Sequence, residues 1–330
     1  MTLKSGIISV VGRTNAGKST LVNRILGEKV SIVSPVAQTT RAVIRGVLTD
    51  ERGQLVLLDT PGLHKSRSLL TTTMNKRARV ASEGTDAILL VVDASVPPQL
   101  EDDGWMRRLV KSTVPVVIAL NKNDKHDKSA EFKNLWKQIG STGFPACDET
   151  KGSTGFPACD KKGSTGFPAC DKNDTGWKAC APIWHSISAS SGNGVDALVS
   201  TLFSLLPAGE PLFDTETLSD YPRKLAIADI IREHFFLVLD DELPHSIGVL
   251  VESIRDEQNR TNIDATILVK RQTHKGIVIG SGGRFIKDAQ KTAAKEISSI
   301  YGTPATVTLR VKVEPGWDEN PFILKQMGFY

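Results

Sequence analysis

The chain has 330 residues, of which 40% are hydrophobic and 24% charged, and its formal net charge is +4. These are ordinary globular values, which exclude collagen-like and wholly disordered classes and predict about two domains. No apolar run reaches the roughly 18 residues of a membrane-spanning helix, and the N-terminus lacks the layout of a signal peptide. We therefore expect a cytoplasmic protein. The sequence has no coiled coil or evident dimer face, which favours a monomer.

The first half alternates short apolar runs with helical stretches. The runs that read as strands are residues 6–11, 54–59, 86–93, 115–121 and 182–188. They are rich in Val, Ile and Leu with little alternation, as strands buried on both faces should be. With helices such as 18–26 and 198–206 between them, they predict an α/β fold with a doubly wound, mostly parallel sheet. Residues 42–49 pair with 54–59 as a hairpin and so predict one antiparallel edge strand.

All four cysteines fall in one window between the last two of these strands: Cys147, Cys159, Cys170 and Cys180. The nonamer Gly-Ser-Thr-Gly-Phe-Pro-Ala-Cys-Asp begins three times there, at residues 140, 152 and 163. A metal or redox cluster is one interpretation. Metal-binding pairs, however, usually lie about two to four residues apart, whereas nine to eleven residues separate these neighbours. We therefore favour a looped-out tandem duplication over about residues 140–180.

The pattern changes at residues 207–222, which contain three prolines and predict a linker between domains 1–206 and 223–330. A helix follows from about residue 223, then strands at 247–254 and 261–271. After residues 276–279 and a glycine break come a helix at 284–300 and a strand at 305–313. This order predicts a second, α+β domain.

A glycine-rich motif, G-x-x-x-x-G-K-S, occupies residues 12–19 between the first strand and the first helix. Glycines let backbone N–H groups wrap phosphates, the lysine reaches the outer phosphates, and the serine offers a hydroxyl to Mg²⁺. The strand before and the helix after it make a chance glycine-rich turn the weaker interpretation. The predicted phosphate-binding residues are Gly12, Asn15, Ala16, Gly17, Lys18, Ser19 and Thr20.

Asp59-Thr60-Pro61-Gly62 follows about 40 residues later, at the end of a predicted strand. A carboxylate there can hold Mg²⁺, and the Gly62 N–H can sense a terminal phosphate. A switch segment should lie within residues 30–41, where we favour Thr40 over Thr39 as the contact for Mg²⁺ and the γ-phosphate. The predicted metal ligands are thus Ser19, Thr40 and Asp59.

Asn121-Lys122-Asn123-Asp124 follows the next strand along the sheet. A carboxylate at Asp124 can accept hydrogen bonds from N1–H and N2–H₂ of guanine, an edge that adenine lacks. Lys122 can pack over the base or the phosphate loop. Ser188 and Ala189, after the last strand, can place a backbone N–H at guanine O6. Together these motifs predict a GTP or GDP site, with Lys18, Thr40, Gly62 and Asn15 as the catalytic candidates.

The second domain contains Ile-Gly-Ser-Gly-Gly at residues 279–283, an I-G-x-x-G loop that opens a helix. Such a loop lets the backbone approach single-stranded RNA and clamps about four nucleotides. From residue 270 to 312 there are nine Lys or Arg residues against two acidic ones, as phosphate contacts require. The predicted RNA-binding residues are Lys275, Gly280, Ser281, Gly282, Gly283, Arg284 and Lys287. For Lys291 and Lys295 a solvated helix face is an equal alternative.

These motifs, with residues 38–41 and 59–64 and the glycine loop, resemble the Era family of bacterial GTPases over nearly the whole chain. The resemblance implies a type II KH domain in the second half. It further implies binding to the 3′ end of 16S ribosomal RNA, a role in 30S subunit assembly, release of RNA on GTP hydrolysis, and peripheral association with the inner membrane. Thr14, in place of the usual proline, and the repeat window depart from the family pattern.

Leu63 stands where Ras-like enzymes carry the glutamine that orients the attacking water. In relatives of this class the phosphate-loop asparagine helps to hold K⁺ beside the phosphates, so Asn15 is a candidate K⁺ ligand. The alternative is that Asn15 only caps the loop. Because Leu63 cannot orient the attacking water, a second function stays open: the protein could be an RNA-binding assembly protein in which the nucleotide only stabilises the fold.

Overall fold

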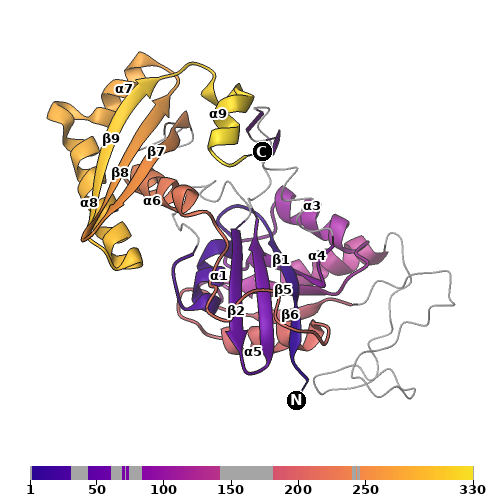
Figure 1. Cartoon of the computed structure of the whole chain (residues 1–330). Coiled ribbons are helices and arrows are strands. Elements are labelled where there is room, and N and C mark those ends of the chain that lie inside the picture. The colour runs from indigo at the N-terminus through magenta and orange to yellow at the C-terminus, as the bar shows by residue number, and fades with distance from the viewer. Residues whose placement is uncertain are drawn as a thin grey trace.

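The computed structural model describes residues 2–30, 44–60, 69, 70, 72, 73, 84–141, 181–239, 243 and 246–329. Two separate sheets organise this part of the chain, one in each half (Figure 1). Apart from its first two residues, 140 and 141, the repeat window with its four cysteines lies outside the described residues. No helix of the described part is long and apolar enough to cross a membrane.

The first sheet has six strands in the order β2-β3-β1-β4-β5-β6. Their bounds are Lys4–Val11 (β1), Ile44–Asp50 (β2), Gly53–Asp59 (β3), Ala87–Asp93 (β4), Val116–Asn121 (β5) and Ile183–Ser186 (β6). β2 is antiparallel to β3 and the other pairs are parallel. This confirms the predicted doubly wound sheet with one antiparallel edge strand. Every residue of β3, β4 and β5 is buried, which explains their unbroken apolar runs.

Helices cover both faces of this sheet. Helices α1 (Lys18–Leu26) and α5 (Val195–Leu205) pack in one hydrophobic cluster with β1 and β3. Helices α3 (Leu100–Leu109) and α4 (Ser129–Ser141) form a second cluster on the other face. Helix α5 begins three residues earlier than predicted because Gly194, at φ 73°, ends the preceding turn in the left-handed region.

The second sheet has the order β7-β8-β9, with β7 and β8 antiparallel and β8 and β9 parallel. The elements of this half are α6 (Arg223–Val238), β7 (Gly248–Glu257), β8 (Arg260–Val269), α7 (Gln272–Ile279), η2 (Ser281–Gly283), α8 (Arg284–Tyr301), β9 (Ala305–Val313), η3 (Trp317–Glu319) and α9 (Pro321–Gln326). α6, α7 and α8 share one hydrophobic cluster with the sheet. Residues 270–271, predicted as strand, lie outside β8, because Arg271 is the N-cap of α7.

The predicted linker, residues 207–222, is bound to the first sheet. The side chain of Gln54 accepts the N–H groups of Leu212 and Phe213 at 2.7 and 2.8 Å and donates to the Phe213 carbonyl at 2.9 Å. Farther along, Val47 donates to the Leu218 carbonyl at 2.9 Å. The backbone of this segment therefore finds hydrogen-bond partners on β3 and on the edge strand β2.

Candidate functional site

The phosphate loop joins β1 to α1 at the carboxyl edge of the parallel strands. Two of its glycines are required by close contacts: a Cβ at Gly12 would lie 2.2 Å from the Val91 carbonyl oxygen, and one at Gly17 would lie 2.2 Å from Asn121 Nδ2. Both also have positive φ, 144° and 95°. Asn15 adopts φ 60°, a region that asparagine tolerates better than most residues. The loop is thus fixed against β4 and β5.

Asn121 joins three of the predicted motifs. Its amide Nδ2 donates to the Ala16 carbonyl in the phosphate loop at 2.8 Å. Its Oδ1 accepts the backbone N–H of Ala189 at 2.9 Å. The asparagine is 2% exposed and its amide satisfies both neighbours, so it holds the phosphate loop and the 188–189 turn together.

Lys122 and Asp124 follow Asn121 on the surface of the same edge. Lys122 adopts φ 64° and its Nζ donates to the Asn15 carbonyl at 2.9 Å. A hydrogen bond from the Ser188 hydroxyl lowers the pKa of Asp124 below its ordinary value. The carboxylate is therefore ionised at neutral pH and able to accept two donors from a base.

Lys18 is buried inside the phosphate loop. Its Nζ donates to the carbonyls of Gly12 and Arg13 at 3.1 and 2.9 Å. Burial lowers the pKa of Lys18 to about 8, although the nearby Asp59 carboxylate opposes this shift. Asp59 itself is fully buried at the end of β3. The lysine and the carboxylate thus lie close enough to interact where phosphates and a cation would meet.

Two predicted residues of this site, Thr40 and Gly62, lie outside the described residues. Ser19 and Thr20 lie in the first turn of α1, directly after the loop, and Asp59 is the last residue of β3, which pairs with β1. Hydroxyl and carboxylate oxygens are hard donors of the kind Mg²⁺ prefers, and this donor set therefore fits the ion.

Three charged residues near the motifs were not predicted: Arg13, Asp93 and Asp102. Asp93 ends β4 and accepts a hydrogen bond from Lys122 at 2.6 Å. Asp102 lies in α3, and Arg13 Nε is 3.4 Å from it. The one sequence signal for Asp93 was its position at the end of a buried strand, which it shares with Asp59 and Asn121.

The glycine loop of the second half connects α7 to α8. Gly280 ends α7, residues 281–283 form a single 3₁₀ turn, and Arg284 begins α8. Ser281, Gly282, Arg284 and Lys287 are exposed, and Lys275 is half-buried on α7. The turn and the start of α8 are therefore open to solvent, and a helix N-terminus favours a bound anion.

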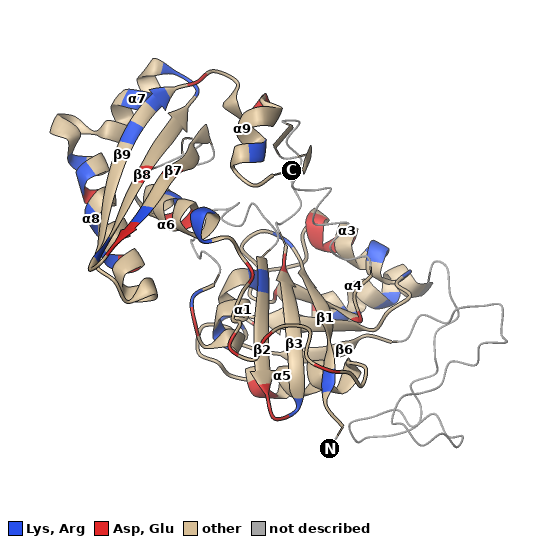
Figure 2. Ribbon diagram, viewed as in Figure 1, with Lys and Arg blue, Asp and Glu red and all other residues tan. Residues whose placement is uncertain are grey.

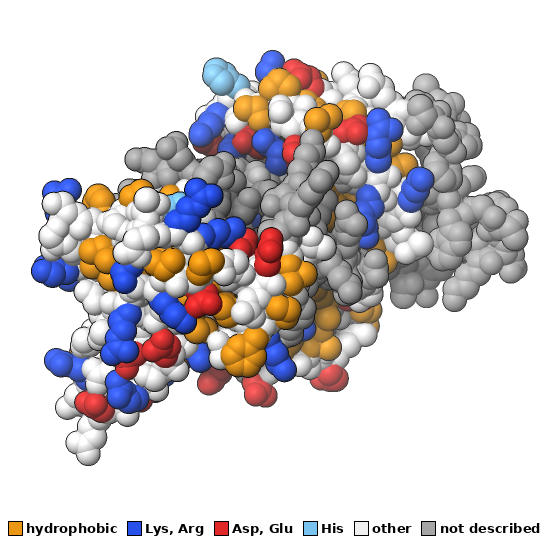
Figure 3. Space-filling view, turned by 90° about the horizontal axis from the view of Figure 1, so that it is seen from above, with side chains coloured by type: hydrophobic (Ala, Val, Ile, Leu, Met, Phe, Trp, Pro, Cys, Tyr) orange, Lys and Arg blue, Asp and Glu red, His pale blue; other side chains and the backbone are white. Residues whose placement is uncertain are grey.

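Lys and Arg residues are frequent on the elements of this half (Figure 2). They lie on α7, α8 and β9, where Lys291, Lys295, Arg310 and Lys312 are exposed as well. Figure 3 shows Lys and Arg side chains over this half of the molecule with hydrophobic side chains between them. Ile277, on α7 just before the loop, is exposed. Basic and apolar groups side by side suit both phosphates and unstacked bases.

The two halves touch close to the predicted switch segment and to the D-x-x-G motif. Lys29, shortly after α1, donates to Glu233 of α6 at 2.7 Å and to Glu296 of α8 at 2.6 Å. On another side Leu70, which is 6% exposed, packs in one cluster with Trp317, Leu324 and Phe329. Leu70 follows the D-x-x-G motif by eight residues. Both contacts therefore join the first half to the second next to segments expected to respond to the nucleotide.

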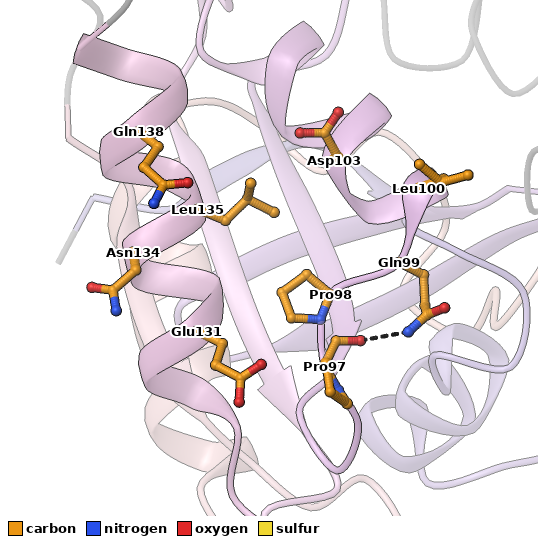
Figure 4. A pocket seen from close by; sticks show the side chains of 9 residues that line it. All are labelled: Pro97, Pro98, Gln99, Leu100, Asp103, Glu131, Asn134, Leu135 and Gln138. Atoms are coloured by element: carbon orange, nitrogen blue, oxygen red, sulfur yellow. Dashed lines mark hydrogen bonds between the residues drawn. The ribbon is translucent and has the colours of Figure 1, made fainter.

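A pocket of about 550 Å³ lies between α3 and α4, away from these motifs (Figure 4). Its apolar lining comes from Pro97, Pro98, Leu100 and Leu135, and Gln99 donates to the Pro97 carbonyl at 2.8 Å. None of the predicted nucleotide-binding residues lines it.

Two family models match this chain. A 50S ribosome-binding GTPase model matches residues 7–122, and a KH domain model matches residues 242–318. The first covers the phosphate loop and the start of the N-K-x-D motif, and the second covers the glycine loop.

Individual relatives match over the full length. The GTPase Era of Carboxydothermus hydrogenoformans is 34% identical over 331 residues, which cover 100% of this chain and 99% of the relative. The GTPase Era of Leuconostoc citreum is 35% identical and covers 99% of this chain, with 97% of its own length matched.

Solved structures agree with this. A variant of Aquifex aeolicus Era bound to GDP and AlF₄⁻ is similar, with a TM-score of 0.82, 31% identity and 99% of both chains covered. A structure of Era in complex with MgGDPNP and nucleotides 1506–1542 of 16S ribosomal RNA gives the same three values. With two domain models in the expected order and relatives above 30% identity over their whole length, this chain belongs to the Era family of GTPases.

Proposed function

We propose that this protein is a GTP-hydrolysing switch that binds the 3′ end of 16S ribosomal RNA through its KH domain and acts in assembly of the 30S subunit. One observation carries the proposal. Hydrogen bonds join the phosphate loop to the base-recognition loop at residues 121–124. The same chain also carries a glycine loop that begins a helix with several basic residues. The similar Era structure that contains both MgGDPNP and a 16S RNA fragment supports the pairing of these ligands.

The phosphates would lie over the loop of residues 12–20. The helix dipole and the N–H groups of the first turn of α1 favour their negative charge. Lys18 has three N–H donors, and two of them bind the carbonyls of Gly12 and Arg13. The third can bind an outer phosphate oxygen, which would stabilise the ammonium form of this buried lysine.

Mg²⁺ use follows from the family, and the metal would be held by Ser19, Asp59 and Thr40. When bound, the ion neutralises charge on the β- and γ-phosphates. We assign the Gly62 N–H to the γ-phosphate, so that Thr40 and Gly62 together distinguish GTP from GDP. Buried Asp59 is the donor best fixed in place, because it continues a fully buried strand.

The guanine base would bind to Asp124 through N1–H and N2–H₂. The turn at Ser188 and Ala189 faces the O6 side of the base in this proposal. Asn121 positions that turn by accepting the Ala189 N–H. Because Asp124 is ionised and already accepts a bond from Ser188, it is oriented before the base arrives.

The RNA would bind across the glycine loop. Backbone groups of residues 280–283 would contact the sugar-phosphate backbone, and Lys275, Arg284 and Lys287 would contact phosphates. The exposure of Ser281, Gly282 and Arg284 supports this assignment, since an RNA strand can reach them without rearrangement of the fold.

We further propose that Asn15 holds K⁺ beside the phosphates, where the cation would stabilise negative charge as an arginine finger does, because Leu63 cannot orient the attacking water. A monomeric state and peripheral association with the inner membrane belong to the same proposal. Sedimentation at micromolar concentration and flotation with anionic vesicles test those two points separately from the chemistry.

The decisive experiment measures GTP turnover in Mg²⁺ with K⁺ or Na⁺, with and without an RNA oligonucleotide that matches the 16S 3′ end. The proposal expects stimulation by that RNA and none by a scrambled one. Equal turnover in K⁺ and Na⁺ would overturn the role of Asn15. If the matching RNA bound without stimulating turnover, the protein would be an RNA-binding assembly factor with a structural nucleotide.

The variant Asp59→Asn separates the same two functions by a different route. Asp59→Asn replaces a metal-binding carboxylate by an amide of equal size, so Mg²⁺ and GTP should no longer act together. In a switch, RNA affinity then becomes the same with GDP and with a GTP analogue. RNA affinity that still responded to the nucleotide would contradict the Mg²⁺-dependent switch.

A further inference from the structure

Asp93 is a buried carboxylate that none of the recognised nucleotide motifs contains. It ends β4, opposite Asn121 in the parallel register of β5, and is 7% exposed. Lys122 Nζ donates to its Oδ2 at 2.6 Å, and the Ser95 backbone N–H donates to its Oδ1 at 3.1 Å. Both carboxylate oxygens are therefore engaged, and the side chain is fixed in one orientation.

The contact with Lys122 restrains a residue in an uncommon backbone conformation. Lys122 has φ 64°, which costs a residue with a Cβ about 1–2 kcal/mol. Two acceptors stabilise its ammonium group in this position: the Asn15 carbonyl at 2.9 Å and Asp93. Without Asp93, only the neutral carbonyl would keep Lys122 against the phosphate loop.

Arg13 of the phosphate loop also contacts Asp93. Its guanidinium lies 3.9 Å from Asp93 and 3.4 Å from Asp102 of α3. Asp102 is fully buried and also accepts the Gln99 N–H at 2.9 Å, which closes the first turn of α3. Arg13 gives both acids a cationic partner, and a buried carboxylate is costly without one.

We propose that Asp93 is a positioning residue for the nucleotide: it fixes Lys122 of the base-recognition motif and Arg13 of the phosphate loop in one arrangement. The base and the phosphates of a guanine nucleotide would then meet two loops already in register, which reduces the ordering that binding requires. This inference rests on the proposed nucleotide site, and it adds a residue that acts only through Lys122 and Arg13.

The test is equilibrium binding of a fluorescent GDP to the full chain in Mg²⁺, with Asp93→Asn, Lys122→Met and the double variant. Asn keeps the shape but removes the charge. We expect GDP to bind to Asp93→Asn roughly tenfold to hundredfold more weakly, as for loss of a charged hydrogen bond. The KM for GTP should rise while kcat stays within about twofold, because Asp93 touches no reacting atom.

The double variant shows whether Asp93 acts through Lys122. If it does, the loss of GDP affinity in the double variant is smaller than the sum of the losses in the two single variants, because only the contact with Arg13 still depends on Asp93. Fully additive losses would overturn the inference, and so would GDP binding to Asp93→Asn within about twofold of the unchanged protein. A failure of Lys122→Met and Lys18→Met to weaken GDP binding would instead refute the proposed nucleotide site itself.

Asp103→Asn is the matched control. Asp103 is the neighbour of Asp102 in α3, and its carboxylate pairs with Arg107 on the surface at 2.7 Å. This control should bind GDP as the unchanged protein does. If Asp93→Asn unfolds, Asp93→Glu keeps the charge on a longer arm. Its GDP affinity should exceed that of Lys122→Met, and an affinity equal to or below that of Lys122→Met would overturn the inference.

Discussion

Lys29 and Glu296 form an ion pair between the two halves of the chain, with Nζ 2.6 Å from Oε1. The same ammonium group lies 2.7 Å from Glu233, and His234 Nε2 lies 3.4 Å from the other oxygen of Glu296. His234 and Lys29 lower the pKa of Glu296 to about 2. Because Lys29 immediately precedes the predicted switch segment, movement of that segment would change its ion pairs with α6 and α8.

Replacing Lys29 by Met should weaken the contact between the halves by about 1–2 kcal/mol, since it leaves two partly buried carboxylates without their shared cation. Thermal unfolding of Lys29→Met, Glu296→Gln and the double variant gives the coupling free energy between the two residues. Lys128→Met, which removes a largely exposed pair with Glu131, is the control and should change stability by less than about 0.5 kcal/mol. A coupling of zero between Lys29 and Glu296 would contradict the structural contact.

GDP affinity should fall as the pH rises above about 8. The pKa of Lys18 is lowered to about 8 without nucleotide, and a bound phosphate stabilises the charged form. Below pH 8 the lysine is already protonated and binding needs no proton. Above pH 8 binding must take up a proton, so affinity drops by up to about tenfold per pH unit.

Titrations between pH 7 and 9 in buffers of different ionisation enthalpy measure this proton uptake directly. In Lys18→Met the uptake should vanish, and uptake that persists there would assign it to another group. The same shift has the opposite sign for folding. A lowered lysine pKa costs stability below about pH 8, and this cost is relieved as the pH rises toward the ordinary value of 10.5.

The fold of both halves was predictable because strand ends and helix starts are marked locally. Asp59, Asn121 and Gly17 each stand at the junction of an apolar run and a polar motif, and all three lie on one sheet edge. Parallel strands bring their carboxyl ends to the same edge, so placement of the motifs followed from the order of elements. The position of residues 207–222 did not follow, because their partner, Gln54, looks like any polar residue in a strand.

The charge contacts around the site were not predictable. Asp93 is followed by Ala-Ser, so it belongs to no glycine-containing motif and its spacing from the other motifs could arise by chance. The contact of Lys29 with α8 joins residues 267 positions apart. Local periodicity encodes which face of a helix is buried, but it does not encode which surface of one domain meets another.

Substitution of Ser281 tests RNA binding at the glycine loop more directly than substitution of Gly280. A Cβ at Gly280 would lie 2.6 Å from the Phe285 ring, so Gly280→Asp would disturb packing as well as charge. Ser281→Asp adds a negative charge at an exposed position of the same turn. It should reduce affinity for the 16S oligonucleotide by about tenfold or more, because the charge repels the RNA backbone.

Ser299→Asp is the control for that experiment, since it places the same charge at an exposed position near the far end of α8. It should bind the oligonucleotide within about twofold of the unchanged protein. Equal affinities for the two aspartate variants, measured by fluorescence anisotropy at one salt concentration, would mean that the glycine loop is not the RNA clamp.

Base selectivity should depend on Asp124 alone among the acidic residues of its loop. Asp124→Asn exchanges an acceptor for a group that also donates, so guanine loses one of two charged hydrogen bonds and meets an unfavourable donor. We expect GDP affinity to fall by roughly hundredfold or more.

Xanthine carries a carbonyl where guanine carries its amino group, so XDP should become the preferred ligand. Asp127→Asn is the matched control, because Asp127 is exposed nearby and its carboxylate accepts the Ser129 N–H at 2.8 Å. Competition of GDP and XDP for each variant measures the preference. An Asp124→Asn variant that still preferred GDP would show that the base is recognised elsewhere.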